Sequence, residues 1–176
     1  MPETNLYSIT IPPMIKTMET LKIVLDKAAV LAESKKNQYM TFESAILGEK
    51  LIFDQLDLKR QIQLVSDNAK GGASRLAEIE TPKMEDTEAT FVELKARLDK
   101  TIAHLQSIKP EQIAGKEGIK IILPFYSGKY ITGFEYVTQY LLPNFYFHAT
   151  TAYAILRKNG LDIGKSDFLG SLPLKD

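Results

Sequence analysis

Four stretches of the chain repeat apolar residues at alternating spacings of three and four, which is the period of one face of an α-helix. A helix with one such stripe must bury it, and four of these helices can bury their stripes against one another. The stripes consist of Met14, Met18, Leu21, Leu25, Ala28 and Ala32; Leu58, Ile62, Val65, Ala69, Gly72, Leu76 and Ile79; Phe91, Leu94, Leu98, Ile102 and Leu105; and Phe134, Val137, Leu141, Phe145, Ala152, Ile155 and Leu156. The sequence therefore predicts an all-α fold, a four-helix bundle, with residues 1–176 in a single domain.

Prolines and a glycine indicate where the first and last helices begin, bend and end. Pro12 and Pro13 suit the first turn of a helix, because the amide hydrogens that they lack have no partner there. Pro143 should kink the last helix or split it in two, and Gly160 should end it. We expect residues 161–176 to form an extended C-terminal tail.

The pattern changes between the third and fourth stripes. Apolar residues alternate with others from Ile119 to Leu123, which is the period of a β-strand, and Ser127-Gly128 offers a turn before a second short run. The sequence predicts a short β-hairpin immediately before the last helix.

Charged residues at three places are expected to lie at the surface. Asp86 or Thr87 can cap the third helix, whose dipole explains the acidic residues around them, Glu85 and Glu88 included. The second helix carries an i, i+3 ion pair, worth about 0.2–0.5 kcal/mol, on the face opposite its stripe. The residues of that pair are Asp67 and Lys70, and His104 of the third helix is likewise expected near the surface, without a role.

The composition excludes several classes of function. Without cysteine the chain can have no thiol nucleophile, disulfide or thiolate-bound metal. Its 22 Lys and Arg residues balance 22 Asp and Glu, so it lacks the positive field that binding to nucleic acid or an anionic membrane requires. It has neither a signal peptide nor the roughly 18 apolar residues of a membrane span. We expect a cytoplasmic protein that binds neither nucleic acid nor membrane.

One polar cluster interrupts the core face of the last helix. His148 lies in the apolar stripe, with Asn144 one turn before it and Thr151 three residues after it. A buried imidazole or amide needs hydrogen-bond partners. The candidate partners are a row of polar residues spaced by seven on the second helix, Gln61, Asn68 and Arg75, or the hydroxyl of Tyr126, Tyr130 or Tyr140.

Two interpretations of this cluster stay open. In the first, which we favour, the protein is a binding or structural module whose pocket holds a small ligand or nothing, and His148 is hydrogen-bonded and inaccessible to solvent. In the second, the protein is a metal-independent enzyme and His148 is its general base. The candidate ligand-binding residues are Asn144, His148, Thr151, Gln61 and Asn68.

The residues predict neither a bound metal nor a cofactor. The chain has two histidines, His104 and His148, whose helical phases point apart, and the acidic residues nearest His148 in sequence are more than ten positions away. A first-row transition metal normally needs three protein ligands that converge. The glycine-rich motifs that bind nucleotides are missing as well.

Two helices also carry apolar residues on the side away from their core stripes. These residues are Ile23 and Val30 on the first helix and Leu142, Tyr146 and Tyr153 on the last. A repeated apolar face usually contacts a second surface. Either the C-terminal tail or the hairpin covers these faces, or they join two copies in a homodimer, which is the partner that we predict.

Four stretches resemble a bacterial family known only as a domain of unknown function. They lie within residues 60–76, 85–94, 142–153 and 164–170, and the most specific is the run Pro143-Asn144-Phe145-Tyr146-Phe147-His148. The resemblance implies a fold similar to the DinB/YfiT-like helical bundles. That superfamily of metalloenzymes includes damage-inducible proteins and thiol-dependent transferases, and its members often form dimers.

The chain departs from the metal-binding members of that superfamily. These members typically place one histidine on the second helix and two, four residues apart, on the last. His148 can correspond to one of the last pair, but Ala152 occupies the position four residues later, and the second helix has no histidine. The metal triad is therefore absent from the sequence, and no residue inherits a catalytic role from the resemblance.

Overall fold

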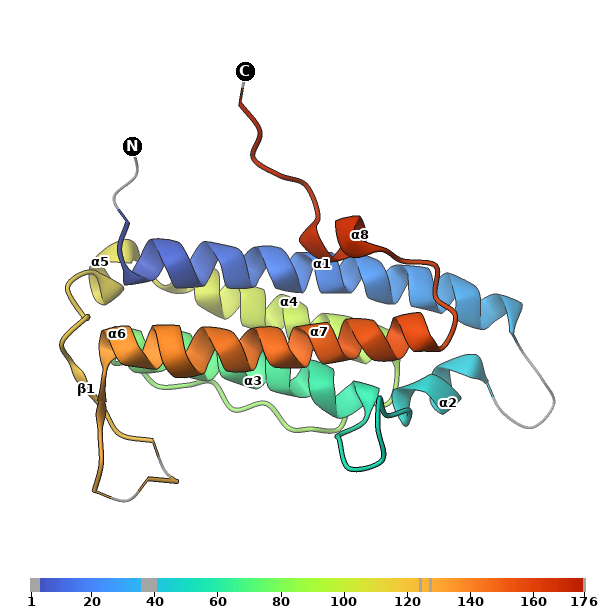
Figure 1. Ribbon diagram of the computed structural model, residues 1–176, viewed down its shortest axis with the longest axis horizontal. Helices are drawn as coiled ribbons and strands as arrows, with labels where there is room; N and C mark the ends of the chain where they lie inside the picture. Colours follow the sequence, from blue (N-terminus) through green and yellow to red (C-terminus); the bar gives the residue numbers. More distant parts are fainter. Residues whose placement is uncertain (1–3, 36–40, 124, 127, 176) are drawn as a thin grey trace.

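The four predicted helices lie side by side as a bundle in the computed structural model, which describes residues 4–35, 41–123, 125–126 and 128–175 (Figure 1). The long helices are α1 (Leu6–Ser34), α3 (Leu58–Ala77), α4 (Phe91–Ser107) and α7 (Leu142–Lys158). The shorter elements are α2 (Phe42–Leu47), α5 (Pro110–Ile113), β1 (Lys120–Ile121), β2 (Ile131–Thr132), α6 (Gly133–Glu135), the π-helix η1 (Tyr136–Leu141) and α8 (Lys165–Leu169). The predicted fold class is confirmed.

Helix α1 begins earlier than its prolines suggested. Asn5 caps it, because the Asn5 Oδ1 accepts from the amide of Ser8 at 3.0 Å while the Ser8 hydroxyl accepts from the amide of Asn5 at 3.0 Å. The first turn buries Leu6, which is 2% exposed, and Pro12 and Pro13 lie inside the helix. The prediction that these prolines form the first turn was wrong, because the capping box and the burial of an additional turn offset their missing hydrogen bonds.

The core consists of the predicted stripes, with two exceptions. All their members are buried except Ile79, which follows the end of α3, and Phe134. Helix α3 packs against both α7 and α4, and a side-chain carbon added at Gly72 would overlap the Cδ1 of Leu141. The missing side chain of Gly72 thus permits the close approach of α3 to the last helix.

The last helix is continuous but changes its geometry before Pro143. Residues Tyr136–Leu141 form a π-helix, and α7 follows directly. A π turn adds one residue to a helix, and it avoids the clash that the proline ring would make in a regular α-helix. The added residue rotates the side chains that precede it by about 100° about the helix axis, relative to those of α7. Phe134 is therefore 52% exposed, whereas Tyr136 is 1% exposed.

The predicted hairpin precedes this helix. Strands β1 and β2 pair in antiparallel register, with Lys120 opposite Thr132 and Ile121 opposite Ile131. Of the predicted turn, Gly128 has a φ of 72°, and Ser127 lies outside the described residues. Figure 1 shows the hairpin extending to one side of the bundle, below the end at which α6 begins.

The C-terminal tail is not simply extended, because it contains α8. This helix lies on α1 and is tied to it by an ion pair of 2.6 Å between Lys27 and Asp167. The ring of Phe168 packs edge-on against Tyr153 of α7, with 5.7 Å between ring centroids. The tail thus covers part of the outer face of α7, whereas Ile23 and Val30 of α1 are 57% and 69% exposed. None of the described helices is long and apolar enough to cross a membrane.

Candidate functional site

His148 of α7 is held in one tautomer by Gln61 of α3. The His148 Nδ1 lies 2.7 Å from the Gln61 Oε1, and the Gln61 Nε2 donates to the carbonyl of Leu56 at 3.0 Å. A carbonyl can only accept, so the Leu56 contact fixes which end of the Gln61 amide faces the histidine. His148 must then donate from Nδ1, and its Nε2 carries the lone pair.

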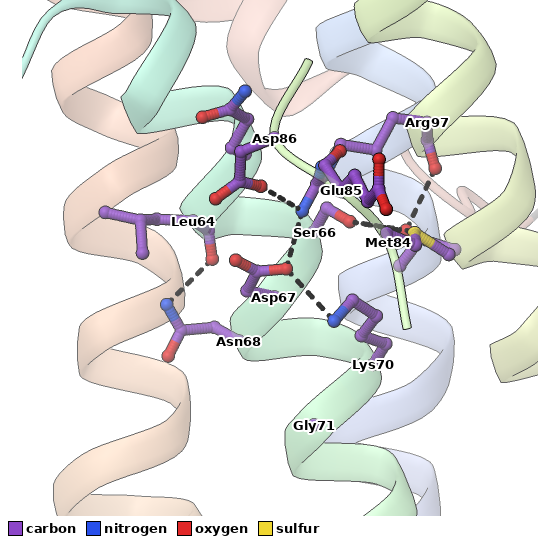
Figure 2. Close-up of polar contacts among 12 residues, drawn as sticks. Leu64, Ser66, Asp67, Asn68, Lys70, Gly71, Met84, Glu85, Asp86 and Arg97 are labelled. Carbon is purple, nitrogen blue, oxygen red and sulfur yellow. Dashed lines mark hydrogen bonds and ion pairs between the residues drawn. The ribbon is translucent and has the colours of Figure 1, made fainter. Parts of the chain in front are cut away.

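Asn144, one turn earlier on α7, is oriented in the same way. The Asn68 Nδ2 donates to the carbonyl of Leu64 at 2.8 Å, a bond that Figure 2 shows, so the Asn68 Oδ1 faces α7. The Asn144 Nδ2 donates to that oxygen at 2.8 Å. The amide oxygen of Asn144 is therefore directed away from Asn68, as a second acceptor on the same helix face as His148.

Arg75 completes the row on α3. Its Nη1 donates to the hydroxyl of Tyr136 at 3.1 Å and to the carbonyl of Gly71 at 3.2 Å. Tyr136 in turn stacks on Tyr140, with 5.8 Å between ring centroids. We call the three pairs Gln61–His148, Asn68–Asn144 and Arg75–Tyr136 the polar seam. The structure thus brings together four of the five candidate residues: Gln61 and Asn68 of the predicted row contact His148 and Asn144. The predicted third partner, Arg75, contacts Tyr136 instead.

Thr151 does not join the polar seam. Its side chain is buried, and its hydroxyl donates to the carbonyl of Phe147 at 2.7 Å. A threonine inside a helix often satisfies its hydroxyl in this way, one turn back along its own backbone. The prediction of Thr151 as a binding residue rested on spacing alone, which cannot show where a hydroxyl points.

His148 is half-buried rather than inaccessible, so that part of the prediction was wrong. It lies at the edge of the α7 stripe, where the helix meets α3, and not at its centre. Burial lowers the pKa of His148 below its ordinary value of 6.5, and the positive charge of Arg60 lowers it further. At neutral pH the imidazole is therefore uncharged, with a basic nitrogen at Nε2.

A second polar cluster lies between α3, α4 and the segment that precedes α4 (Figure 2). Arg97 of α4 is 2% exposed. Its Nη2 lies 2.7 Å from Asp67 and 3.0 Å from Asp86, and its Nη1 donates to Glu88 at 3.0 Å. Lys70 contacts Asp67 at 3.0 Å. We call these five residues the arginine cluster.

The arginine cluster corrects two predictions. Asp67 and Lys70 are not a surface pair, because Lys70 is 8% exposed and Asp67 bridges it to Arg97. The helix cap is Thr90, whose hydroxyl accepts from the amide of Glu93 at 3.2 Å. Of the acidic residues before it, Asp86 and Glu88 contact Arg97 through their carboxylates, whereas Glu85 accepts from this arginine through its backbone carbonyl at 3.0 Å.

His104 is not an isolated surface residue either. Its Nε2 lies 2.8 Å from the hydroxyl of Ser74 on α3, and the ring is half-buried. Burial, and then the charge of Lys70, lowers the pKa of His104 below 6.5. It lies at a groove of about 670 Å³ between α4 and the segment before it, whose lining also includes Arg97. The phase of His104 on its own helix could not reveal this contact with a neighbouring helix.

The described residues include no group of three or more His, Cys, Asp or Glu side chains placed to hold a metal ion. His104 and His148 bond to side chains of α3 that are thirteen residues apart in sequence, Ser74 and Gln61. The hydrogen-bonded nitrogen of His104 is therefore paired with a hydroxyl, and that of His148 with an amide oxygen.

A family model described as "Domain of unknown function (DUF1993)" matches residues 6–169, which is most of the chain. The chain belongs to the DUF1993 family. This DUF1993 protein is also similar to a solved structure, a crystal structure of a DinB family member from Shewanella denitrificans. The two chains are 38% identical, the match covers 97% of this chain and 95% of the other, and the TM-score is 0.90.

These findings confirm the resemblance to a domain-of-unknown-function family with a DinB-like fold, which the sequence indicated. The DUF1993 protein has a DinB-like helical fold, with a hairpin before its last helix. No curated protein matches the chain.

Proposed function

We propose that this DUF1993 protein binds a small molecule at the polar seam, through the Nε2 of His148 and the amide oxygen of Asn144. The observation that carries the proposal is the contact between Gln61 and the carbonyl of Leu56, which orients the histidine. A fixed tautomer supports recognition of a ligand, because it presents the donors and acceptors of the site in a constant pattern.

The chemistry of the two atoms indicates a neutral ligand with hydrogen-bond donors. Both atoms accept, and neither His148 nor Asn144 carries a charge at neutral pH. Arg60 acts on the His148 imidazole electrostatically, which disfavours a cation there. A small amide or a polyol offers N–H or O–H groups without a charge, and this is the class that we assign.

The availability of the Nε2 can be tested with diethyl pyrocarbonate, which acylates unprotonated imidazole nitrogen. His104 is the internal control, because its Nε2 is engaged by Ser74. We expect mass spectrometry at pH 7 to find His148 modified several-fold faster than His104. If His148 stays unmodified under conditions that modify His104, the seam is a structural feature and holds no ligand.

Binding itself can be followed through the side-chain ¹⁵N resonances of both histidines during titration with acetamide and with glycerol. We expect the Nε2 resonance of His148 to shift in a saturable manner while the resonances of His104 stay constant. Asn144→Leu removes one acceptor and should weaken the titration. Equal shifts of both histidines would indicate a solvent effect and contradict the proposal.

The same nitrogen supports a second candidate function, in which His148 is the general base of a metal-independent enzyme. A positioned base contributes about 10²–10⁴ in rate. Gln61→Leu retains the volume of the side chain and removes the acceptor that orients the imidazole. If a bound compound is consumed, and Gln61→Leu slows its consumption more than it weakens its binding, the enzyme is favoured over the binding module.

A further inference from the structure

A second cavity lies beneath the hairpin, at the far end of the polar seam. It has a volume of about 300 Å³, which is enough for a molecule of one or two fused rings. Ile121, Leu123 and Ile131 form its apolar wall, and these residues come from the two strands and the segment that follows β1. We call this cavity the hairpin pocket.

One side of the hairpin pocket is a rigid aromatic surface. Tyr140 lines the pocket and stacks on the buried ring of Tyr136. The hydroxyl of Tyr136 is fixed in turn by Arg75. A tyrosine that is packed in this way loses little conformational freedom when a flat ligand stacks on it.

Two further tyrosines of the lining are exposed. Tyr126 and Tyr130 also line the hairpin pocket, and they are 56% and 54% exposed. Exposed aromatic side chains gathered at one place on a surface usually mark a binding site.

The charge at the hairpin pocket is positive. Lys129 lines it, and the ammonium group of Lys120 lies 4.7 Å from the ring centroid of Tyr130. The described residues that line this pocket include no Asp or Glu. One lysine in the lining and a second beside the ring of Tyr130, without a carboxylate in the lining, match a ligand whose flat apolar body carries a negative charge.

We propose that the hairpin pocket binds a planar aromatic anion, such as an aryl carboxylate or sulfonate. The ring lies between Tyr140 and Tyr130, and the anionic group pairs with Lys129. This site is distinct from the acceptor atoms of His148 and Asn144, so each proposal can fail without the other.

The fluorescent aromatic sulfonate 8-anilinonaphthalene-1-sulfonate tests this proposal on the folded protein. We expect saturable binding of one molecule per chain. Lys129→Gln should weaken its affinity about fivefold, which is the effect of losing one partly exposed ion pair. Tyr130→Ala should weaken it further. The neutral analogue N-phenyl-1-naphthylamine should bind equally well to the Lys129→Gln variant and to the original protein.

A matched control separates this site from general binding to exposed apolar groups. Phe53 lies in the loop between α2 and α3 and is 86% exposed, and Phe53→Ala should leave the affinity unchanged. Lys129 is exposed, so its substitution should not alter the unfolding midpoint, and a change in affinity then reports on the site. Equal affinity in the original protein, Lys129→Gln and Tyr130→Ala, or an equal loss in Phe53→Ala, would overturn the proposal.

Discussion

Helix α3 carries the polar seam on one side and the arginine cluster on another. The two differ in how the key side chain, His148 or Arg97, is paired with its neighbours. In the arginine cluster both terminal nitrogens of Arg97 contact carboxylates, and Lys70 shares Asp67 with them. In the polar seam neutral amides fix one nitrogen of His148 and leave an acceptor at the other. The Nε of Arg97 has no hydrogen-bond partner among the described residues either, so the two regions differ in exposure: Arg97 is buried and holds α4 against α3, whereas His148 is half-buried.

The largest expected effect is in the arginine cluster. Arg97→Met should lower the free energy of unfolding by about 2–4 kcal/mol, because it removes several charge-assisted hydrogen bonds of a buried guanidinium and leaves the mostly buried Glu88 without this cation. Urea denaturation measures this loss. Arg157→Met is the matched control, since Arg157 contacts Asp162 at 3.2 Å on the exposed surface, and it should cost less than about 1 kcal/mol. Similar losses in the two variants would show that the cluster does not hold the fold.

In the polar seam, His148→Ala should lower the free energy of unfolding by about 1–3 kcal/mol, because it leaves the buried Gln61 oxygen without a donor. Gln61→Leu should have a cost of similar size. The double variant should cost less than the sum of the two, with an interaction energy of at least about 0.5 kcal/mol. Strict additivity would mean that the 2.7 Å contact contributes nothing to stability.

Two neighbouring glycines test the close approach of α3 to the last helix. Gly72→Ala should destabilise the protein by about 1–3 kcal/mol, because the new carbon would overlap the buried Leu141. Gly71→Ala meets its nearest atom at an ordinary 3.5 Å, so it should stabilise the helix by about 0.5–1 kcal/mol. Thermal unfolding of both variants shows whether each raises or lowers the unfolding midpoint. A change in the same direction for both would contradict the close packing of Gly72 against Leu141.

The two histidines predict how stability depends on pH. Burial lowers the pKa of both His104 and His148 below 6.5, so the unfolded chain binds more protons than the folded one as the pH falls. Stability should be full above about pH 7.5 and should decrease as the pH falls through 6.5 toward the folded values. His148→Phe should reduce this slope between pH 7.5 and 5.5. If His148→Phe leaves the dependence of stability on pH unchanged, His104 alone accounts for that dependence.

The smallest effect on the fold is expected at the outer face of α1, which lies apart from both clusters. We propose that Ile23 and Val30 contribute to a homodimer interface, because their exposed side chains repeat at the spacing of two helical turns. The double variant Ile23→Gln, Val30→Gln should keep its unfolding midpoint and change from dimer to monomer in light scattering. A monomeric original protein would contradict the interface.

Local spacing predicted those parts of the molecule in which each helix acts alone. The four stripes follow from the helical period, and the spacing of seven on α3 placed Gln61 and Asn68, the partners of His148 and Asn144, among the candidates. The spacing could not exclude the tyrosine hydroxyls or show that Arg75 contacts Tyr136 instead. Both relationships depend on the geometry of a regular helix, which the sequence displays directly.

The arginine cluster and the hairpin pocket could not be predicted in this way. Arg97 is thirty residues from Asp67, and the segment that carries Asp86 has no periodic pattern that would place it over α3. The one available signal was an arginine close to the apolar stripe of α4, near several acidic residues. The prediction assigned those residues to the helix dipole, because a local explanation was available.

The π turn gives the two halves of the last helix separate angular registers. Tyr136 and Asn144 are eight residues apart, so in a regular α-helix their directions would differ by about 80°. If the added residue is counted as a bulge, Tyr136 and Asn144 are effectively seven residues apart, and their directions differ by only about 20°. Their partners on α3, Arg75 and Asn68, are also seven residues apart. The extra residue thus lets the last helix contact α3 with the same seven-residue repeat that α3 has. Helix α7 keeps its contacts to α3, and the segment before it, which follows the hairpin, has a different orientation about the helix axis.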